Sequence, residues 1–168
     1  ISFSAVGSLN DKIKPGMFIV PDQFIDKTYN RINTFFDSDL VCHVSMSKPT
    51  SDSLSQTCIN ALKEIGLEHH MGGTYIAIEG PQFSTHAESK FYKAFGADVI
   101  GMTNMPEAKL AREAEIRYAT IGMVTDYDCY RLEYLDVDIS QIILTLKNNI
   151  KVAKNIIDIL ITTFDKNI

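Results

Sequence analysis

Short β-prone runs alternate with helical patterns along the whole chain, and this alternation restricts the fold more than any other feature. Apolar runs bounded by glycine, proline or polar residues predict strands at residues 3–6, 17–25, 72–79, 98–102 and 117–124. Apolar spacing or helix-start signals predict helices at residues 54–65, 85–95, 106–114 and 139–160. Strands that alternate with helices form βαβ units, so we expect an α/β fold with a mixed, largely parallel central sheet flanked by helices.

Helix ends and one long polar stretch complete this outline. Thr85 and Glu88 have the spacing of a capping box. Asp52 or Ser53 is expected to cap the helix before it, and Gly66 is expected to end that helix. Residues 27–53 are polar with few periodic apolar positions, so we expect a long irregular segment there, and such segments tend to be functional.

Composition and charge exclude several classes of protein. With 168 residues and 45% hydrophobic content, the chain can form one domain with its own core. Its net charge of −5 and its lack of a basic cluster argue against nucleic acid as a partner. No apolar run approaches the roughly 20 residues of a membrane helix, so we expect no membrane association.

Neither the cysteines nor the histidines indicate a disulfide framework or a metal site. The three cysteines are far apart and form no CxxC pair, which indicates reduced thiols in a cytoplasmic protein. His69, His70 and His86 have no cysteine or carboxylate at ligand spacing. We therefore expect no metal and no cofactor.

The sequence has no initiator methionine and opens directly in a β-prone run that ends at Gly7. This opening is typical of a sequence that begins inside a domain. We expect a fragment of a longer protein.

Ligands of open α/β sheets bind beyond the carboxyl ends of the strands, so the residues that follow each apolar run are candidates for a site. Asp126 and Asp128 follow the last run and point to the same side if the strand continues. Two carboxylates held close disfavour double ionisation, so one can stay protonated near neutral pH and act as a general acid. The alternative, which the residues alone favour, is that the pair solvates a turn or caps the next helix.

The other strand ends carry weaker signals. Residues 4–8 offer small side chains where backbone N–H groups can hold an anion, although a plain strand-to-turn transition explains them better. Phe83 can present an aromatic face to a flat ligand or pack in the core, and Ser84 can make a polar edge contact. Met102 and Thr103 set an apolar surface beside a hydroxyl, with core filling and a turn as the simpler account.

Several blocks, taken together, resemble one family. Ser-Ala-Val-Gly-Ser-Leu at 4–9 is similar to the end of the purine nucleoside phosphorylase signature, and residues 16–26 resemble the stretch that follows it. Ile-Glu-Gly-Pro-Gln-Phe-Ser-Thr-His-Ala-Glu at 78–88 and Asp-Val-Ile-Gly-Met-Thr at 98–103 also match. Thr-Asp-Tyr-Asp-Cys at 125–129 resembles the methylthioadenosine phosphorylase branch in particular. The resemblance covers nearly the whole chain.

This resemblance implies a three-layer fold of the purine nucleoside phosphorylase type, present in part. A glycine-rich phosphate loop and an Arg-His pair precede the position of Ile1 in the family. Residues 1–168 would therefore form a single phosphorylase domain that lacks its N-terminal part. The resemblance also implies a homotrimer whose small-molecule partners are a nucleoside and inorganic phosphate, the latter a co-substrate and not a cofactor.

The resemblance assigns roles to particular positions. Three positions match phosphate contacts: Ser4, Ala5 and Thr103. Nine positions match substrate contacts: His43, Phe83, Ser84, Met102, Asp126, Asp128, Ile139, Ile142 and Ile143. Among these, Asp126 would be the catalytic acid, the three isoleucines would surround the methylthio group, and His43 would reach the pocket of a neighbouring subunit.

These roles imply phosphorolysis of S-methyl-5'-thioadenosine to adenine and S-methyl-5-thioribose 1-phosphate. An acid at the purine nitrogen would assist departure of the base while phosphate approaches the ribosyl carbon from the opposite face. A carboxylate pair favours the amino group of adenine over the oxo group of hypoxanthine or guanine. The alternatives are a phosphorylase that acts on inosine, guanosine or methylthioinosine, and an inactive nucleoside-binding fragment.

Overall fold

A computed structural model describes residues 1–36, 39–134 and 139–165. Within these ranges one sheet is formed by β1 (Ser2–Ser8), β2 (Phe18–Val20), β3 (Gln23–Lys27), β4 (His69–Met71), β5 (Thr74–Ile78), β6 (Val99–Gly101) and β7 (Thr120–Tyr127). The helices are α1 (Asp52–Glu64), α2 (His86–Ala94), α3 (Glu107–Glu113), the short 3-10 helix η1 (Leu132–Tyr134) and α4 (Ile139–Asp165). The predicted α/β fold, a mixed sheet flanked by helices, is confirmed.

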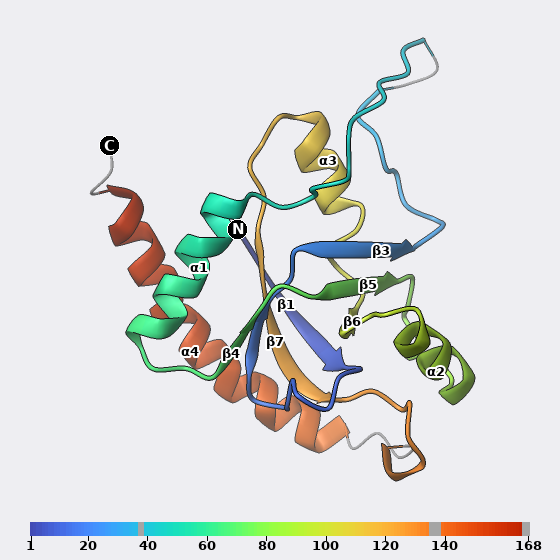
Figure 1. The fold of residues 1–168 in the computed structure, drawn as a ribbon, viewed down its shortest axis with the longest axis vertical. Helices are drawn as coiled ribbons and strands as arrows, with labels where there is room; N and C mark the ends of the chain where they lie inside the picture. The colour runs from blue at the N-terminus through green and yellow to red at the C-terminus, as the bar shows by residue number, and fades with distance from the viewer. Residues whose placement is uncertain (37–38, 135–138, 166–168) are drawn as a thin grey trace.

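The sheet curls back on itself. Its strand order is β3-β5-β6-β1-β7-β2-β4, yet β2 continues into β3, and β4 into β5, through bends at residues 21–22 and 72–73. These consecutive strands belong to opposite ends of the order, so the sheet must bend for the chain to connect them (Figure 1). The N–H of Asp22 donates to the carbonyl of Gly73 at 3.1 Å and ties the two bends together.

Strand direction reverses in the middle of the sheet. The β3-β5-β6 group is parallel, the β1-β7 pair is parallel, and the two groups meet in an antiparallel pairing of β1 with β6. The β1-β7 register slips by one residue between Val6 and Gly7, because Val6 pairs with Val124 but Gly7 pairs with Asp126. Thr125 is therefore the extra residue of a bulge, a feature that re-aims the side chains next to it.

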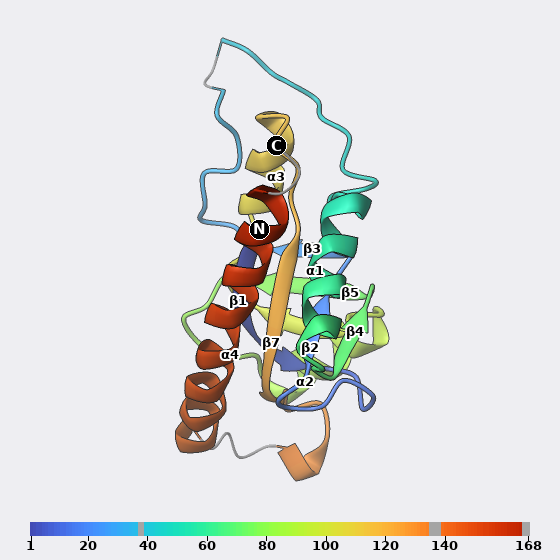
Figure 2. The same cartoon turned by 90° about the vertical axis from the view of Figure 1, so that its left-hand side faces the viewer.

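Buried side chains form an inner group and two outer groups. The inner group draws on β1, β2, β5, β6, β7 and α3, with Tyr75 at its centre. On β2, Ile19 faces this inner group, whereas Phe18 and Val20 face α1 and α4. The third group lies between α2 and strands β5 and β6. Figure 2 shows α1 and α4 running along β7, and α2 lies away from this pair, beyond β5 (Figure 1).

The predicted helices are confirmed, and the capping residue of α1 is corrected. Thr85 and Glu88 form the predicted capping box at the start of α2. The cap of α1 is Ser51, one residue before the predicted Asp52 or Ser53, and its side chain accepts from the N–H of Leu54. Strand β4 was not expected from the sequence, because a three-residue run gives no alternation to detect. Within the described ranges, no helix is long and apolar enough to cross a membrane.

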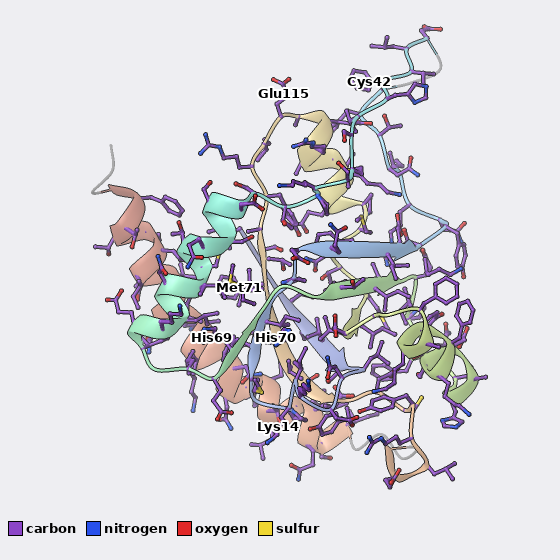
Figure 3. The ribbon with its side chains drawn as sticks, viewed as in Figure 1. Lys14, Cys42, His69, His70, Met71 and Glu115 are labelled. Atoms are coloured by element: carbon purple, nitrogen blue, oxygen red, sulfur yellow. The ribbon has the colours of Figure 1, made fainter. Side chains whose placement is uncertain are left out.

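The segment between β3 and α1 has no helix or strand in its described part, as the sequence predicts. It projects beyond the sheet near α3 in both views (Figure 1 and Figure 2). Figure 3 places Cys42 toward the outer end of this projection, far from His69 and His70 on β4.

Candidate active site

A cavity of about 270 Å³ lies over the seam where the two groups of strands meet. Three parts of the chain that are far apart in sequence line it, namely the second half of β1, the ends of β5 and β6, and the end of β7. Its lining residues are Ala5, Val6, Gly7, Ile78, Phe83, Ser84, Ile100, Gly101, Met102, Thr103, Thr125, Asp126, Asp128 and Ile142. The cavity borders the carboxyl ends of β5, β6 and β7, and ligands of open α/β sheets bind beyond such ends.

Asp126 enters the cavity because of the bulge in β7. Thr125, the extra residue, donates from Oγ1 to Asp126 Oδ1 at 2.6 Å. Gly7 lies opposite, and a Cβ there would come within 3.7 Å of Asp126 Oδ2 and 3.2 Å of the Ile100 side chain. A larger residue at Gly7 would therefore crowd the carboxyl group.

Burial raises the pKa of Asp126 to about 6, since a desolvated carboxylate loses the hydration of its charge. The nearby Asp128 raises this pKa further, while the hydrogen bond from Thr125 lowers it. A carboxyl group with a pKa near 6 is partly protonated at neutral pH. It can therefore give a proton to a ligand, as a general acid does.

Asp128 is held by a different set of donors. Ser84 Oγ lies 3.1 Å from Asp128 Oδ2, and Ser89 of α2 donates to the same oxygen. Burial raises the pKa of Asp128, while the hydrogen bonds from Ser89 and Ser84 lower it. The network fixes the orientation of the carboxyl group, which is 8% exposed.

A cluster of hydroxyl groups forms the other end of the cavity. Ser4 Oγ lies 2.8 Å from Thr103 Oγ1 and 3.1 Å from the hydroxyl of Tyr75. Thr103 lines the cavity, whereas Ser4 is 2% exposed and lies directly beneath it. Hydroxyls are suitable donors to the oxygens of an anion.

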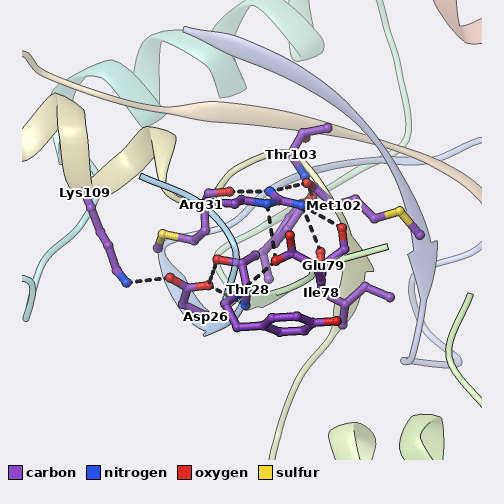
Figure 4. A network of polar contacts seen from close by, with 11 residues as sticks. Asp26, Thr28, Arg31, Ile78, Glu79, Met102, Thr103 and Lys109 are labelled. Atoms are coloured by element: carbon purple, nitrogen blue, oxygen red, sulfur yellow. Dashed lines mark hydrogen bonds and ion pairs between the residues drawn. The ribbon is translucent and has the colours of Figure 1, made fainter. Parts of the chain in front are cut away.

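Arg31 supports the cavity from behind, and sequence reasoning did not identify it. Its guanidinium donates to the carbonyls of Met102 at 2.6 Å and Glu79 at 2.8 Å, and also to those of Met105 and Ile78. Figure 4 shows this group between the loops that leave β5 and β6. It also pairs with the Glu79 carboxylate at 3.6 Å. The irregular segment thus fixes the spacing of two cavity walls.

The structure brings most of the predicted site residues together. Ser4 lies beneath Thr103. Eight others line the cavity: Ala5, Phe83, Ser84, Met102, Thr103, Asp126, Asp128 and Ile142. Ile139 and Ile143 of α4 lie outside the lining and are 60% and 46% exposed. His43 is exposed, within the projecting segment and outside the lining of its own chain's cavity.

Six lining residues had no individual role assigned by the family resemblance, although some lie in segments that the strand-end argument had indicated: Val6, Gly7, Ile78, Ile100, Gly101 and Thr125. All belong to strands or border them, and their side chains carry little chemistry, except for the hydroxyl of Thr125. His69 and His86, from which the sequence analysis expected no metal binding, contact backbone carbonyls. His69 Nδ1 lies 2.7 Å from the Leu67 carbonyl, and His86 Nδ1 lies 2.5 Å from the Cys129 carbonyl.

Comparison with known proteins identifies the family to which this chain belongs. The phosphorylase superfamily profile matches residues 1–162. The S-methyl-5'-thioadenosine phosphorylase of Geobacter sulfurreducens is 52% identical over 158 residues, covering 94% of this chain and 55% of that protein. That of Cereibacter sphaeroides is 52% identical over 157 residues, covering 94% of this chain and 54% of that protein. The chain thus spans about half the length of these relatives.

Solved structures show the same fold. A methylthioadenosine phosphorylase from an antarctic soil metagenomic library superimposes with a TM-score of 0.89 at 44% identity, over 98% of this chain and 58% of that one. The Schistosoma mansoni methylthioadenosine phosphorylase in complex with adenine gives a TM-score of 0.90 at 32% identity, over 97% of this chain and 64% of that one.

Proposed function

The chain belongs to the phosphorylase superfamily, and from this premise we propose that its gene product cleaves S-methyl-5'-thioadenosine with inorganic phosphate. The products are adenine and S-methyl-5-thioribose 1-phosphate. The names of the relatives and of the solved structures support this substrate. The observation that carries the proposal is the cavity itself, with a carboxyl group of pKa about 6 at one end and donor hydroxyls at the other.

The proposed reaction joins these two ends. A phosphate oxygen held near Ser4, Ala5 and Thr103 forms a bond to the ribosyl C1' carbon, and the bond from that carbon to the purine nitrogen breaks. The electron pair of that bond moves onto the purine. Asp126 donates its proton to the imidazole nitrogen of the purine, which neutralises the charge that develops in the transition state.

Substrate selection follows from the same side chains. The protonated Asp126 faces a ring nitrogen, and the Asp128 carboxylate accepts from the exocyclic amine of adenine. An oxo group in the amine's place would leave two acceptors facing each other, which costs binding free energy. Ile142 lines the cavity and supplies apolar surface for a methylthio group, at about 0.8 kcal/mol per buried CH₂ equivalent.

Adenine release from methylthioadenosine, measured with and without inorganic phosphate, tests this proposal on the full-length gene product. Release that requires phosphate is the expected result. Inosine and methylthioinosine, assayed in parallel, should be cleaved at least tenfold less efficiently. Release of hypoxanthine at an equal rate would instead favour the oxopurine enzymes, and no release of either base would contradict a phosphorylase.

The proposal includes a cytoplasmic homotrimer in which neighbouring subunits share a site. His43 supports this arrangement, because it is exposed and does not line the cavity of its own chain. The same segment exposes Ile32 and Val41, and apolar side chains on such a surface are typical of an interface. Mixing subunits that carry His43→Ala with subunits that carry Asp126→Asn should restore part of the activity if sites are shared. Sedimentation as a monomer, or no recovery on mixing, would contradict it.

A further inference from the structure

The geometry points to Tyr75 as a positioning residue that orients the two hydroxyls of the anion end, Ser4 and Thr103, so that both donate into the cavity. Tyr75 does not line the cavity, because its side chain is fully buried within the curl of the sheet. It therefore acts on a bound anion through its neighbours. This inference rests on the proposed function, in which the anion is phosphate.

The Tyr75 hydroxyl lies at the junction of the anion end. Its oxygen accepts from the backbone N–H of Thr103 at 3.4 Å and lies 3.1 Å from Ser4 Oγ. The ring packs edge-on against Phe24, with their centroids 5.7 Å apart, so the ring is fixed. One hydroxyl thus links the side chain of Ser4 to the backbone of Thr103, two of the three residues to which the family resemblance assigns phosphate contacts.

The direction of the protons follows from the inventory of donors. A tyrosine hydroxyl has one proton. Thr103 Oγ1 gives its own proton to the side-chain oxygen of Asn104 at 3.1 Å. Ser4 Oγ therefore donates to Thr103 Oγ1 at 2.8 Å and accepts the proton of Tyr75. When an anion enters, the protons of Ser4 and Thr103 can turn to its oxygens while Tyr75 still satisfies Ser4.

The chain makes room for this hydroxyl. A Cβ on Gly101 would overlap the Tyr75 oxygen and would also lie 2.7 Å from the ring carbon that bears it. Any larger residue would displace the hydroxyl from the seam between β1 and β6. The same Cβ would also crowd the ring of a phenylalanine at position 75, so Gly101 makes room for the ring as well as for the hydroxyl.

The test is the affinity of the full-length gene product for inorganic phosphate, measured by calorimetry for wild type and for Tyr75→Phe. The variant removes one oxygen and leaves the ring in place. Loss of one hydrogen bond in the network should weaken phosphate binding about three- to tenfold. The KM for phosphate should rise by the same factor, whereas the KM for methylthioadenosine should not change.

Tyr118→Phe is the matched control. Tyr118 is also a buried tyrosine of the inner group, but its hydroxyl bonds to Ser2 and Asn104 and not to Ser4 or Thr103. The inference is overturned if Tyr75→Phe binds phosphate as wild type does, if Tyr118→Phe weakens phosphate equally, or if the KM values of both substrates rise together. If wild type binds phosphate but does not cleave methylthioadenosine, the proposed function fails and the calorimetry still decides the role of Tyr75.

Discussion

At one end of the cavity two carboxyl groups are buried and ionisable, and at the other end three neutral hydroxyls are linked in a chain. Asp126 and Asp128 sit after the bulge of β7 and lose hydration, which raises their pKa values. The neutral hydroxyls of Ser4, Tyr75 and Thr103 can only donate or accept hydrogen bonds. The carboxyl end repels an anion, whereas the hydroxyl end can bind one. In the proposed function, this difference sets the purine at the carboxyl end and phosphate at the hydroxyl end.

The largest effect should come from removing the acid. Asp126→Asn keeps the shape of the side chain, but an amide is not an acid near neutral pH and cannot donate a proton to the purine. We expect kcat for methylthioadenosine phosphorolysis to fall by about 10²- to 10⁴-fold, as for other general acids. Phosphate binding at the hydroxyl end should not change. A fall in kcat of less than tenfold in steady-state assays would show that the carboxyl end does not supply the catalytic acid through Asp126.

The second effect should appear at the hydroxyl end alone. Ser4→Ala removes a donor to a charged ligand, so the affinity for phosphate should fall about ten- to hundredfold. Binding of methylthioadenosine, measured without phosphate, should be unaffected. If nucleoside binding weakened as much as phosphate binding, the two ends would not be independent.

Asp126→Asn should also stabilise the fold. The pKa of Asp126 is raised from 3.8 to about 6, so the folded state holds a proton that the unfolded state releases between these values. Stability is therefore lost as pH rises through this window, and the loss is complete above it. The amide of asparagine does not ionise and so avoids this loss. We expect the free energy of unfolding of the variant to exceed that of wild type by about 2 kcal/mol at pH 7 and by less at pH 5.

Urea unfolding at both pH values measures this gain. Asp26→Asn is the opposite control, because hydrogen bonds from Lys109 and Thr28 outweigh the effect of burial and lower the pKa of Asp26. That variant should lose stability where the Asp126 variant gains it. A gain for Asp126→Asn that does not grow with pH would contradict the assignment.

The last effect, small near pH 6 and growing above it, should be in the pH profile. If protonated Asp126 is the acid, kcat/KM should fall about tenfold per pH unit once the pH exceeds about 6. The affinity for phosphate analogues that do not titrate in this range should stay constant. The profile of Asp126→Asn should lack this descending limb, and its persistence would assign the acid to another group.

The sequence predicted the elements better than their arrangement. Alternating runs identified the helices and most strands, although they missed β4 and merged β2 with β3. The capping box at Thr85 was confirmed because both of its partners are local. The curl of the sheet depends on bends at residues 21–22 and 72–73, whose consequence appears only when all strands are paired. Local patterns contain no information about pairing between distant strands.

The same division applies to the site. Asp126 and Ser84 stand out because their side chains carry chemistry beside a turn, and the family resemblance assigned them roles. Arg31 and Tyr75 could not be found in this way, because one lies in a polar segment and the other in an apolar run. What makes them relevant is contact with residues 28 to 74 positions away, which only the fold provides. The roles assigned to His43, Ile139 and Ile143 stay predictions.

The pairing of β1 has a consequence for the order of events during synthesis. Ser2 bonds to Thr120 across a separation of 118 residues, and the other partner of β1, β6, begins at Val99. The pairing of β1 with β7 can therefore form only after β7 has left the ribosome. Contacts this distant in sequence slow folding. Ser4 lies on β1 and Asp126 lies on β7, so both ends of the cavity depend on this pairing, and the complete cavity forms only once β7 is available.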